Sequence, residues 1–171
     1  MGCPVLAMLV AFLGGCVTSL PSLVAGRPLF GRSVEVETLL GLLERTGQGL
    51  GAAAFIRGEA GIGKTSLAVV LADRALARGF RVLRGAASEL ELDRPFGALA
   101  QAFEIGSDSS DRERAGMARL LLGEAGGRGP GARRPPGVRF RLIEAFVSLA
   151  ERLGLAGPVL VVIEDLHWAD P

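Results

Sequence analysis

One run of consecutive residues has the types and the spacing needed to hold the phosphates of a nucleotide. The sequence from Gly58 to Thr65 reads GEAGIGKT and fits the pattern GxxxxGK[ST] at every defined position. In this pattern the backbone N–H groups point into one concavity, and the first turn of the following helix adds the positive end of its dipole. The Lys64 ammonium would reach the β- and γ-phosphates, and the Thr65 hydroxyl would bind Mg²⁺, which prefers oxygen ligands.

The composition of the chain supports this interpretation of the loop. Lys64 is the only lysine among 19 basic residues, so a chain strongly biased toward arginine still has lysine where a phosphate loop requires it. The plainer interpretation is a chance glycine-rich turn before a helix, but here an apolar strand pattern, the loop and a helical pattern follow one another in register. The predicted nucleotide-binding residues of the loop are Gly58, Glu59, Ala60, Gly61, Ile62, Gly63, Lys64, Thr65 and Ser66.

Two acids far downstream could complete such a site. Glu164 and Asp165 follow Val159–Ile163, an apolar and largely β-branched run that is typical of a strand buried on both faces. The carboxyl ends of parallel strands form the ligand-binding edge of an open α/β sheet. One acid would orient Mg²⁺ and the other would position or deprotonate the attacking water; by position we assign Glu164 to the metal and Asp165 to the water. The plainer interpretation is a pair of surface acids at a strand end.

The elements that must position these residues alternate between helix and strand. Hydrophobic periodicity and turn residues predict helices over about 33–45, 64–78, 93–103, 112–122 and 138–153, and strands over 52–56, 80–85 and 159–163. Ser33 is the predicted N-cap of the first helix. The strand, helix and strand around the loop have the spacing of a βαβ unit, which predicts an α/β fold with parallel strands.

Length and composition limit the class of protein. At 171 residues, 49% apolar and 22% charged, the chain fits one globular domain, and a net charge of +1 gives no broad electrostatic case for nucleic acid. Residues 123–137 are rich in Gly, Pro and Arg and predict a loop, and we prefer a solvated loop to a phosphate-binding tract. Cys3 and Cys16 are the only cysteines, so a disulfide or cysteine-based metal site is not expected beyond them. His167 has no second ligand at a metal-binding spacing and is expected to pack with Trp168 beside the nucleotide.

The first 26 residues carry no charged side chain. The apolar run Val5–Leu13 is too short to span a bilayer comfortably, and although it resembles the core of a signal peptide, or with Cys16 a lipobox, it lacks the basic residues that precede such a core. We therefore interpret residues 1–27 as a poorly ordered apolar extension, and residues 28–171 as the domain. Nucleotide binding is not expected to need residues 1–26.

Three stretches together resemble a known family. These stretches are Leu29-Phe30-Gly31-Arg32, Gly58–Thr65, and Val161–Asp170, which ends EDLHWAD. In this order they are similar to the N-terminal AAA-type ATPase module of large ATP-binding LuxR-family transcriptional regulators, in the STAND class of signalling ATPases. The resemblance covers roughly residues 28–171. It implies a P-loop NTPase fold, a three-layer αβα sandwich with a parallel sheet, and ATP and Mg²⁺ as ligands. It also implies that Phe30, Gly31 and Arg32 lie near the adenine.

The sequence departs from this family in two respects. Many relatives have Asp where this chain has Glu164, and the chain stops at Pro171, before the remaining strands, the sensor residues, the arginine finger and the DNA-binding domain. The resemblance therefore implies a fold that is incomplete at its C-terminus, with three strands and without the strand that normally flanks the phosphate-loop strand on its other side. It further implies a cytoplasmic fragment with weak hydrolysis, possible self-association through the module, and DNA binding only through a domain absent from this chain. A P-loop kinase and a membrane-tethered ATP-binding interaction protein are the alternative interpretations.

Overall fold

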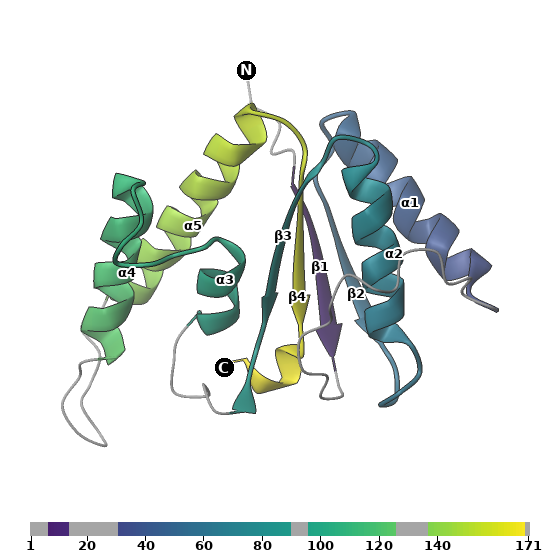
Figure 1. The fold of residues 1–171 in the computed structure, drawn as a ribbon, viewed down its shortest axis with the longest axis horizontal. Coiled ribbons are helices and arrows are strands. Elements are labelled where there is room, and N and C mark those ends of the chain that lie inside the picture. The colour runs from purple at the N-terminus through teal and green to yellow at the C-terminus, as the bar shows by residue number, and fades with distance from the viewer. Residues whose placement is uncertain (1–6, 14–30, 90–95, 126–136, 170–171) are drawn as a thin grey trace.

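Four parallel strands form the centre of the protein. The computed structural model describes residues 7–13, 31–89, 96–125 and 137–169. The strands are β1 (Ala7–Leu13), β2 (Ala52–Arg57), β3 (Arg81–Ala86) and β4 (Val159–Glu164), and their order across the sheet is β2-β1-β4-β3. Because every pairing is parallel, all carboxyl ends lie at one edge of the sheet, toward which the arrows of Figure 1 point.

Helices cover the two faces of this sheet, as Figure 1 shows. One face is covered by α1 (Ser33–Gly47) and α2 (Lys64–Leu76), and the other by α3 (Gly97–Ala102), α4 (Arg112–Ala125) and α5 (Val138–Leu155). The prediction of an α/β three-layer sandwich with a parallel sheet is confirmed.

Two apolar cores hold the layers together, and β4 contributes to both. Leu160 and Val162 pack with α1 and α2, whereas Val159, Val161 and Ile163 pack with α3, α4 and α5. All five side chains are buried, which confirms the prediction of a strand enclosed on both faces. The position of Glu164, at the end of this strand, is therefore fixed by the packing of the five residues before it.

The largest difference from the sequence-based expectation is β1. Residues 1–27 were expected to be a poorly ordered extension beside a sheet of three strands, but Ala7–Leu13 form a strand between β2 and β4. The seven residues are all apolar, so they suit the interior of a sheet as well as they suit the core of a signal peptide. The expectation that residues 1–26 are dispensable loses its basis, while residues 1–6 and 14–27 lie outside the described part of the chain.

Several predicted boundaries also shift. The N-cap of α1 is Arg32 rather than Ser33, and it makes no side-chain capping hydrogen bond. The helix α4 continues to Ala125, so the predicted loop at 123–137 begins later than expected, and residues 126–136 are outside the description. The helix α3 begins at Gly97, and the segment 90–95, where its start was expected, is likewise not described.

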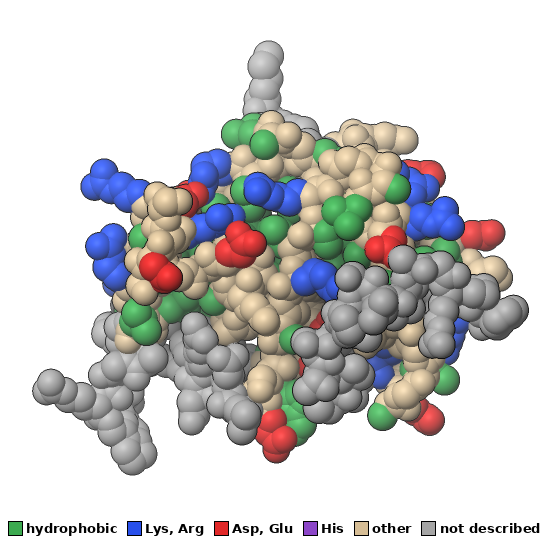
Figure 2. All heavy atoms as spheres, viewed as in Figure 1, with side chains coloured by type: hydrophobic (Ala, Val, Ile, Leu, Met, Phe, Trp, Pro, Cys, Tyr) green, Lys and Arg blue, Asp and Glu red, His purple; other side chains and the backbone are tan. Residues whose placement is uncertain are grey.

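The surface carries mixed charge. On the face drawn in Figure 2, basic and acidic side chains are interspersed, in keeping with the net charge of +1. Arg152 of α5 lies 2.6 Å from a carboxylate oxygen of Asp111, directly before α4, and 2.9 Å from one of Glu113 within α4. Within the described ranges, none of the helices is both long and apolar enough to cross a membrane.

Candidate functional site

The predicted phosphate loop connects the end of β2 to the start of α2 at the carboxyl edge of the sheet. The strand β2 ends at Arg57 and α2 begins at Lys64, so the loop lies directly between them. The residues Gly58, Glu59, Ala60, Gly61 and Ile62 are exposed, and Gly63, Lys64, Thr65 and Ser66 are half-buried. The loop therefore presents its backbone to solvent while the first turn of α2 anchors it.

Two glycines in the loop meet specific steric demands. Gly63 is the N-cap of α2 with φ of 94°, a left-handed conformation in which a side chain would be strained. A Cβ at Gly58 would lie 2.9 Å from Cγ2 of Ile62, closer than two carbon atoms can approach without a shift. The spacing of glycines in the sequence thus corresponds to backbone that needs glycine.

The Lys64 ammonium lies across this loop. Its Nζ donates hydrogen bonds of 2.9 Å to the carbonyl oxygen of Gly58 and of 2.9 Å to that of Glu59. An ammonium has three N–H donors, so within the described part of the chain one donor remains for a phosphate oxygen. The side chain is held at the loop by its own backbone and retains capacity for an anion.

Arg32 connects the start of α1 to the same loop. Its Nη2 donates a 3.2 Å hydrogen bond to the carbonyl oxygen of Ile62, and its Nη1 lies 2.7 Å from Oε1 of Glu35. The hydrogen bond from the Arg32 guanidinium lowers the pKa of the Glu35 carboxyl. The structure therefore brings Arg32, one of the three residues expected near the adenine, to the phosphate loop; Gly31 directly precedes it, and Phe30 lies outside the described residues.

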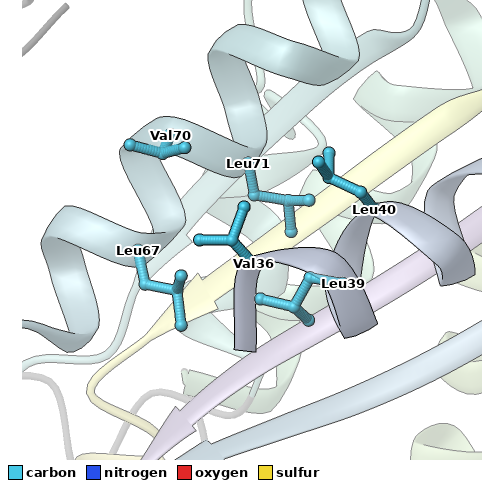
Figure 3. Close-up of a pocket in the computed structure, with 6 residues that line it drawn as sticks. All are labelled: Val36, Leu39, Leu40, Leu67, Val70 and Leu71. Carbon is cyan, nitrogen blue, oxygen red and sulfur yellow. The ribbon is translucent and has the colours of Figure 1, made fainter. Parts of the chain in front are cut away.

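An apolar seam between α1 and α2 supports this arrangement. Figure 3 shows that side chains of the two helices point toward one another there. The side chains that line the seam are Val36, Leu39 and Leu40 of α1 and Leu67, Val70 and Leu71 of α2. It has no polar lining residue that could orient a ligand, so we interpret it as packing that fixes the start of α1 relative to the loop.

The acid pair lies at the same edge of the sheet. Oε1 of Glu164 accepts a 2.6 Å hydrogen bond from Nη2 of Arg84 on the adjacent strand β3, and the Glu164 side chain is only 16% exposed. An ionised carboxylate accepts several hydrogen bonds or metal contacts, so this ion pair leaves capacity on Glu164 for a cation. Asp165 has φ of 55°, a left-handed conformation that Asp tolerates better than most residues, and it begins the short 3-10 turn Leu166–Trp168.

Arg84 is a site residue that the sequence-based reasoning missed. In the sheet register Ala86 of β3 is opposite Glu164, so Arg84 projects from the same face two residues earlier and reaches the carboxylate. In the sequence, Arg84 resembles any exposed residue of a strand with alternating polarity. Only the pairing of β3 with β4 shows that its partner is Glu164.

The turn after the acids brings two aromatic rings to this edge. The ring centroids of His167 and Trp168 are 4.8 Å apart and tilted by 44°, as expected for packed neighbours. The loop, Arg32, the acids and these rings thus lie along the same edge of the sheet, at the carboxyl ends of β2 and β4. Besides the His167 imidazole, the groups of the described residues there that could bind a metal are the Thr65 hydroxyl and the carboxylates of Glu164 and Asp165, and these oxygens suit Mg²⁺.

Comparison with known proteins gives a consistent result. Residues 28–171 match the family described as AAA ATPase domain. A protein of Rhizobium meliloti (strain 1021), "Uncharacterized protein R02095", is 28% identical over 167 residues; the match includes 85% of this chain and 16% of the relative. The chain therefore spans less than a fifth of the length of that curated relative. No solved structure matches significantly.

Proposed function

Since the chain belongs to the AAA ATPase domain family, we propose that it binds ATP with Mg²⁺ at the carboxyl edge of its sheet and acts as a nucleotide-dependent switch. The observation that carries this proposal is the arrangement of the two motifs, because the phosphate loop after β2 and the acids after β4 reach the same edge of a parallel sheet. This edge is where open α/β folds bind their ligands.

Each group at the edge has a distinct role in this proposal. The loop backbone from Gly58 to Gly63 and the ammonium of Lys64 bind the phosphates, and Arg32 keeps the start of α1 close enough for the nucleoside to rest beside it. Thr65 and Glu164 would hold Mg²⁺ directly or through water. When bound, the ion neutralises charge on the phosphate oxygens.

Hydrolysis by this chain is proposed to be slow. Asp165 is suited to position water, but an arginine that neutralises charge on the transferred phosphate contributes about 10³ to 10⁵ in rate. Arg84, the arginine joined to the acid pair, is engaged with Glu164. In this proposal the chain binds ATP but hydrolyses it slowly, so that the bound nucleotide persists, as a switch requires.

The wider context is proposed from the resemblance of the motifs. The ending EDLHWAD together with Phe30-Gly31-Arg32 favours the module of a LuxR-family regulator of the STAND class. In that case ATP and ADP are the direct ligands, self-association occurs through the module in the cytoplasm, and any contact with DNA belongs to a domain outside these residues. The match to a small part of a much longer relative is consistent with a module of this kind.

Isothermal titration with Mg-ATP tests the assignment of the site. Lys64→Ala should weaken binding by about 2 kcal/mol, or about 30-fold, because a charge-assisted contact with phosphate is lost. Arg74→Ala is a matched control, since it removes an exposed positive charge from the same helix α2, about 15 Å along the axis from Lys64. Equal affinities for the parent chain and Lys64→Ala would show that the loop does not bind nucleotide.

A further inference from the structure

One peptide group of the phosphate loop is held by a side chain from outside the loop. The carbonyl oxygen of Ile62 accepts a 3.2 Å hydrogen bond from Nη2 of Arg32, which lies 30 residues earlier in the sequence. A trans peptide is planar, and its C=O and N–H groups point in opposite directions. The bond to the Ile62 carbonyl therefore also fixes the direction of the Gly63 N–H, which is one of the loop groups proposed to bind phosphate.

The backbone around this peptide group is weakly constrained by its own neighbours. Gly61 and Gly63, on either side of Ile62, have φ of 78° and 94°, and glycine exchanges between left- and right-handed conformations at low cost. The turn hydrogen bond from the Ile62 N–H to the carbonyl oxygen of Glu59 is long, at 3.4 Å. The contact with Arg32 thus selects one orientation of a peptide group that is able to rotate.

Two cations divide the support of the loop between them. Lys64, which directly follows the loop, donates hydrogen bonds of 2.9 Å to the carbonyl oxygens of Gly58 and Glu59 at the start of the loop. Arg32 holds the peptide group at the other end. Because Arg32 is the N-cap of α1, the orientation of the last loop peptide depends on where α1 lies.

The backbone of Arg32 is firmly placed. Its carbonyl oxygen accepts a 3.0 Å hydrogen bond from the N–H of Val36, in the first turn of α1. The helix α1 packs against α2 along the apolar seam of Figure 3, and α2 begins where the loop ends. The point from which Arg32 reaches out is therefore fixed relative to the loop.

The side chain of Arg32 needs a further partner, and Glu35 provides it. The Arg32 side chain is 35% exposed, so packing does not fix its rotamer, but its Nη1 lies 2.7 Å from Oε1 of Glu35. Residues three apart share one face of a helix. The hydrogen bond from Arg32 lowers the pKa of the Glu35 carboxyl, which is therefore ionised at neutral pH. Since the guanidinium is planar and rigid, a carboxylate held at one nitrogen sets the direction of the other.

We propose that Arg32 and Glu35 are positioning residues of the nucleotide site. Glu35 orients the Arg32 guanidinium, and Arg32 holds the Ile62 carbonyl so that the Gly63 N–H points toward the bound phosphate. The role toward phosphate rests on the proposed nucleotide binding, whereas the orientation of the Ile62–Gly63 peptide concerns the loop by itself. This role differs from the adenine contact that the resemblance implies for Arg32.

The orientation of the peptide group is tested without nucleotide. In the ¹⁵N-labelled chain, Glu35→Ala and Arg32→Ala should both move the NMR amide resonance of Gly63, because the Ile62 carbonyl loses its fixed donor. Glu37→Ala is the matched control, since it removes the same charge from an exposed position of α1 that is two residues further on and faces another direction. A Gly63 resonance that stays at its parental position in both Glu35→Ala and Arg32→Ala overturns the proposal.

Inorganic tripolyphosphate separates this role from an adenine contact, because it carries the phosphates without a base. In calorimetric titrations with Mg-ATP and with Mg-tripolyphosphate, Arg32→Ala should weaken both ligands by the same factor, about tenfold. Glu35→Ala should weaken both by about threefold, since the pair is partly exposed to solvent, and Glu37→Ala should match the parent chain. Weaker ATP binding with parental tripolyphosphate binding would assign Arg32 to the nucleoside and overturn the proposal.

Arg32→Lys distinguishes the geometry of the guanidinium from its charge. Lysine keeps the positive charge but has a single nitrogen, so it does not reproduce two bonds from separate nitrogens in one plane. Arg32→Lys should therefore resemble Arg32→Ala in the Gly63 resonance and in both titrations. Parental behaviour of Arg32→Lys would show that charge suffices and would contradict an orienting role. Glu35→Ala changes a partly exposed helix position and keeps the test decisive if either Arg32 variant fails to fold.

The outcomes separate this proposal from the proposed function. If Lys64→Ala leaves ATP binding unchanged, the nucleotide assignment fails, while the Gly63 resonance still tests the clamp on the loop. If Lys64→Ala weakens binding but Glu35→Ala and Arg32→Ala bind both ligands like the parent, the nucleotide assignment stands and the positioning role is wrong. Losses in both titrations without a moved Gly63 resonance would mean that Arg32 contacts phosphate directly, which also overturns the positioning role.

Discussion

The ion pair between Arg84 and Glu164 should limit how tightly the proposed site holds Mg²⁺. The guanidinium occupies one oxygen of the carboxylate at 2.6 Å, so a cation must share Glu164 with a positive charge. Arg84→Ala should therefore lower the Mg²⁺ concentration needed for half-maximal binding of fluorescent ATP. Removing the Arg84 guanidinium also frees that carboxylate oxygen of Glu164 for a metal contact.

The size of this effect follows from geometry and exposure. A hydrogen bond to a charged group contributes about 1.5 to 3 kcal/mol when shielded from water. Because the Arg84 side chain is 39% exposed, solvent screening reduces the contribution to about 1 kcal/mol. We therefore expect the Mg²⁺ requirement to fall about fivefold.

Two further variants isolate the cause. Arg84→Lys keeps the positive charge and should stay within about twofold of the parent, since repulsion of the cation is retained. Arg81→Ala removes a charge at the start of β3, about 10 Å along the strand from Arg84. At that distance in water, the repulsion between the Arg81 charge and the metal ion is at most about 0.4 kcal/mol per unit charge. If Arg84→Ala raises the Mg²⁺ requirement or leaves it unchanged, Arg84 does not compete with the metal, and its role is instead to hold Glu164 in place for the ion.

Four other substitutions give distinct expected results. Asp165→Asn should spare ATP binding and remove residual phosphate release in a malachite-green assay, whereas Glu164→Gln should weaken Mg²⁺-dependent binding; unchanged release in Asp165→Asn would contradict the assigned roles. Gly63→Ala should destabilise the chain by about 1 to 2 kcal/mol in denaturant unfolding, because the left-handed backbone at φ of 94° strains a side chain. The hydrogen bond from Arg152 lowers the pKa of Asp111 below its ordinary 3.8, so the stability that this pair contributes is fully present above that value and is lost as pH falls through the lowered pKa. Denaturant unfolding of the parent and Asp111→Asn should accordingly differ at neutral pH and converge in acid; a difference that persists in acid would mean that the ion pair is not its source.

The site motifs were predictable because their chemistry is local. The loop from Gly58 to Thr65 is recognised by glycines whose conformations are set within a few residues, and β4 by an apolar run long enough to be enclosed on both faces. The family match to residues 28–171 and the parallel sheet confirm the AAA-type module and its fold class. The roles of individual site residues stay predictions.

The features that sequence reasoning missed depend on which strands are neighbours. Arg84 meets Glu164 only because β3 pairs with β4 in a particular register. The run Ala7–Leu13 has the composition of a signal-peptide core and also of a buried strand, and only the position between β2 and β4 distinguishes the two. Strand order is set by contacts between residues far apart in the chain, and local patterns do not encode them.

The pairing of β1 with β4 also affects the time course of folding. Ala7 is opposite Val159, so two adjacent strands of the sheet are almost the whole chain apart in sequence. Translation at about 5 to 20 residues per second would separate their emergence from the ribosome by about 8 to 30 s. During that interval the apolar segment Ala7–Leu13 cannot pair with β4, and contacts between such distant residues form slowly. The final closure of the sheet is thus expected to follow synthesis of β4, and chaperones that bind extended apolar segments would find a target in Ala7–Leu13 until then.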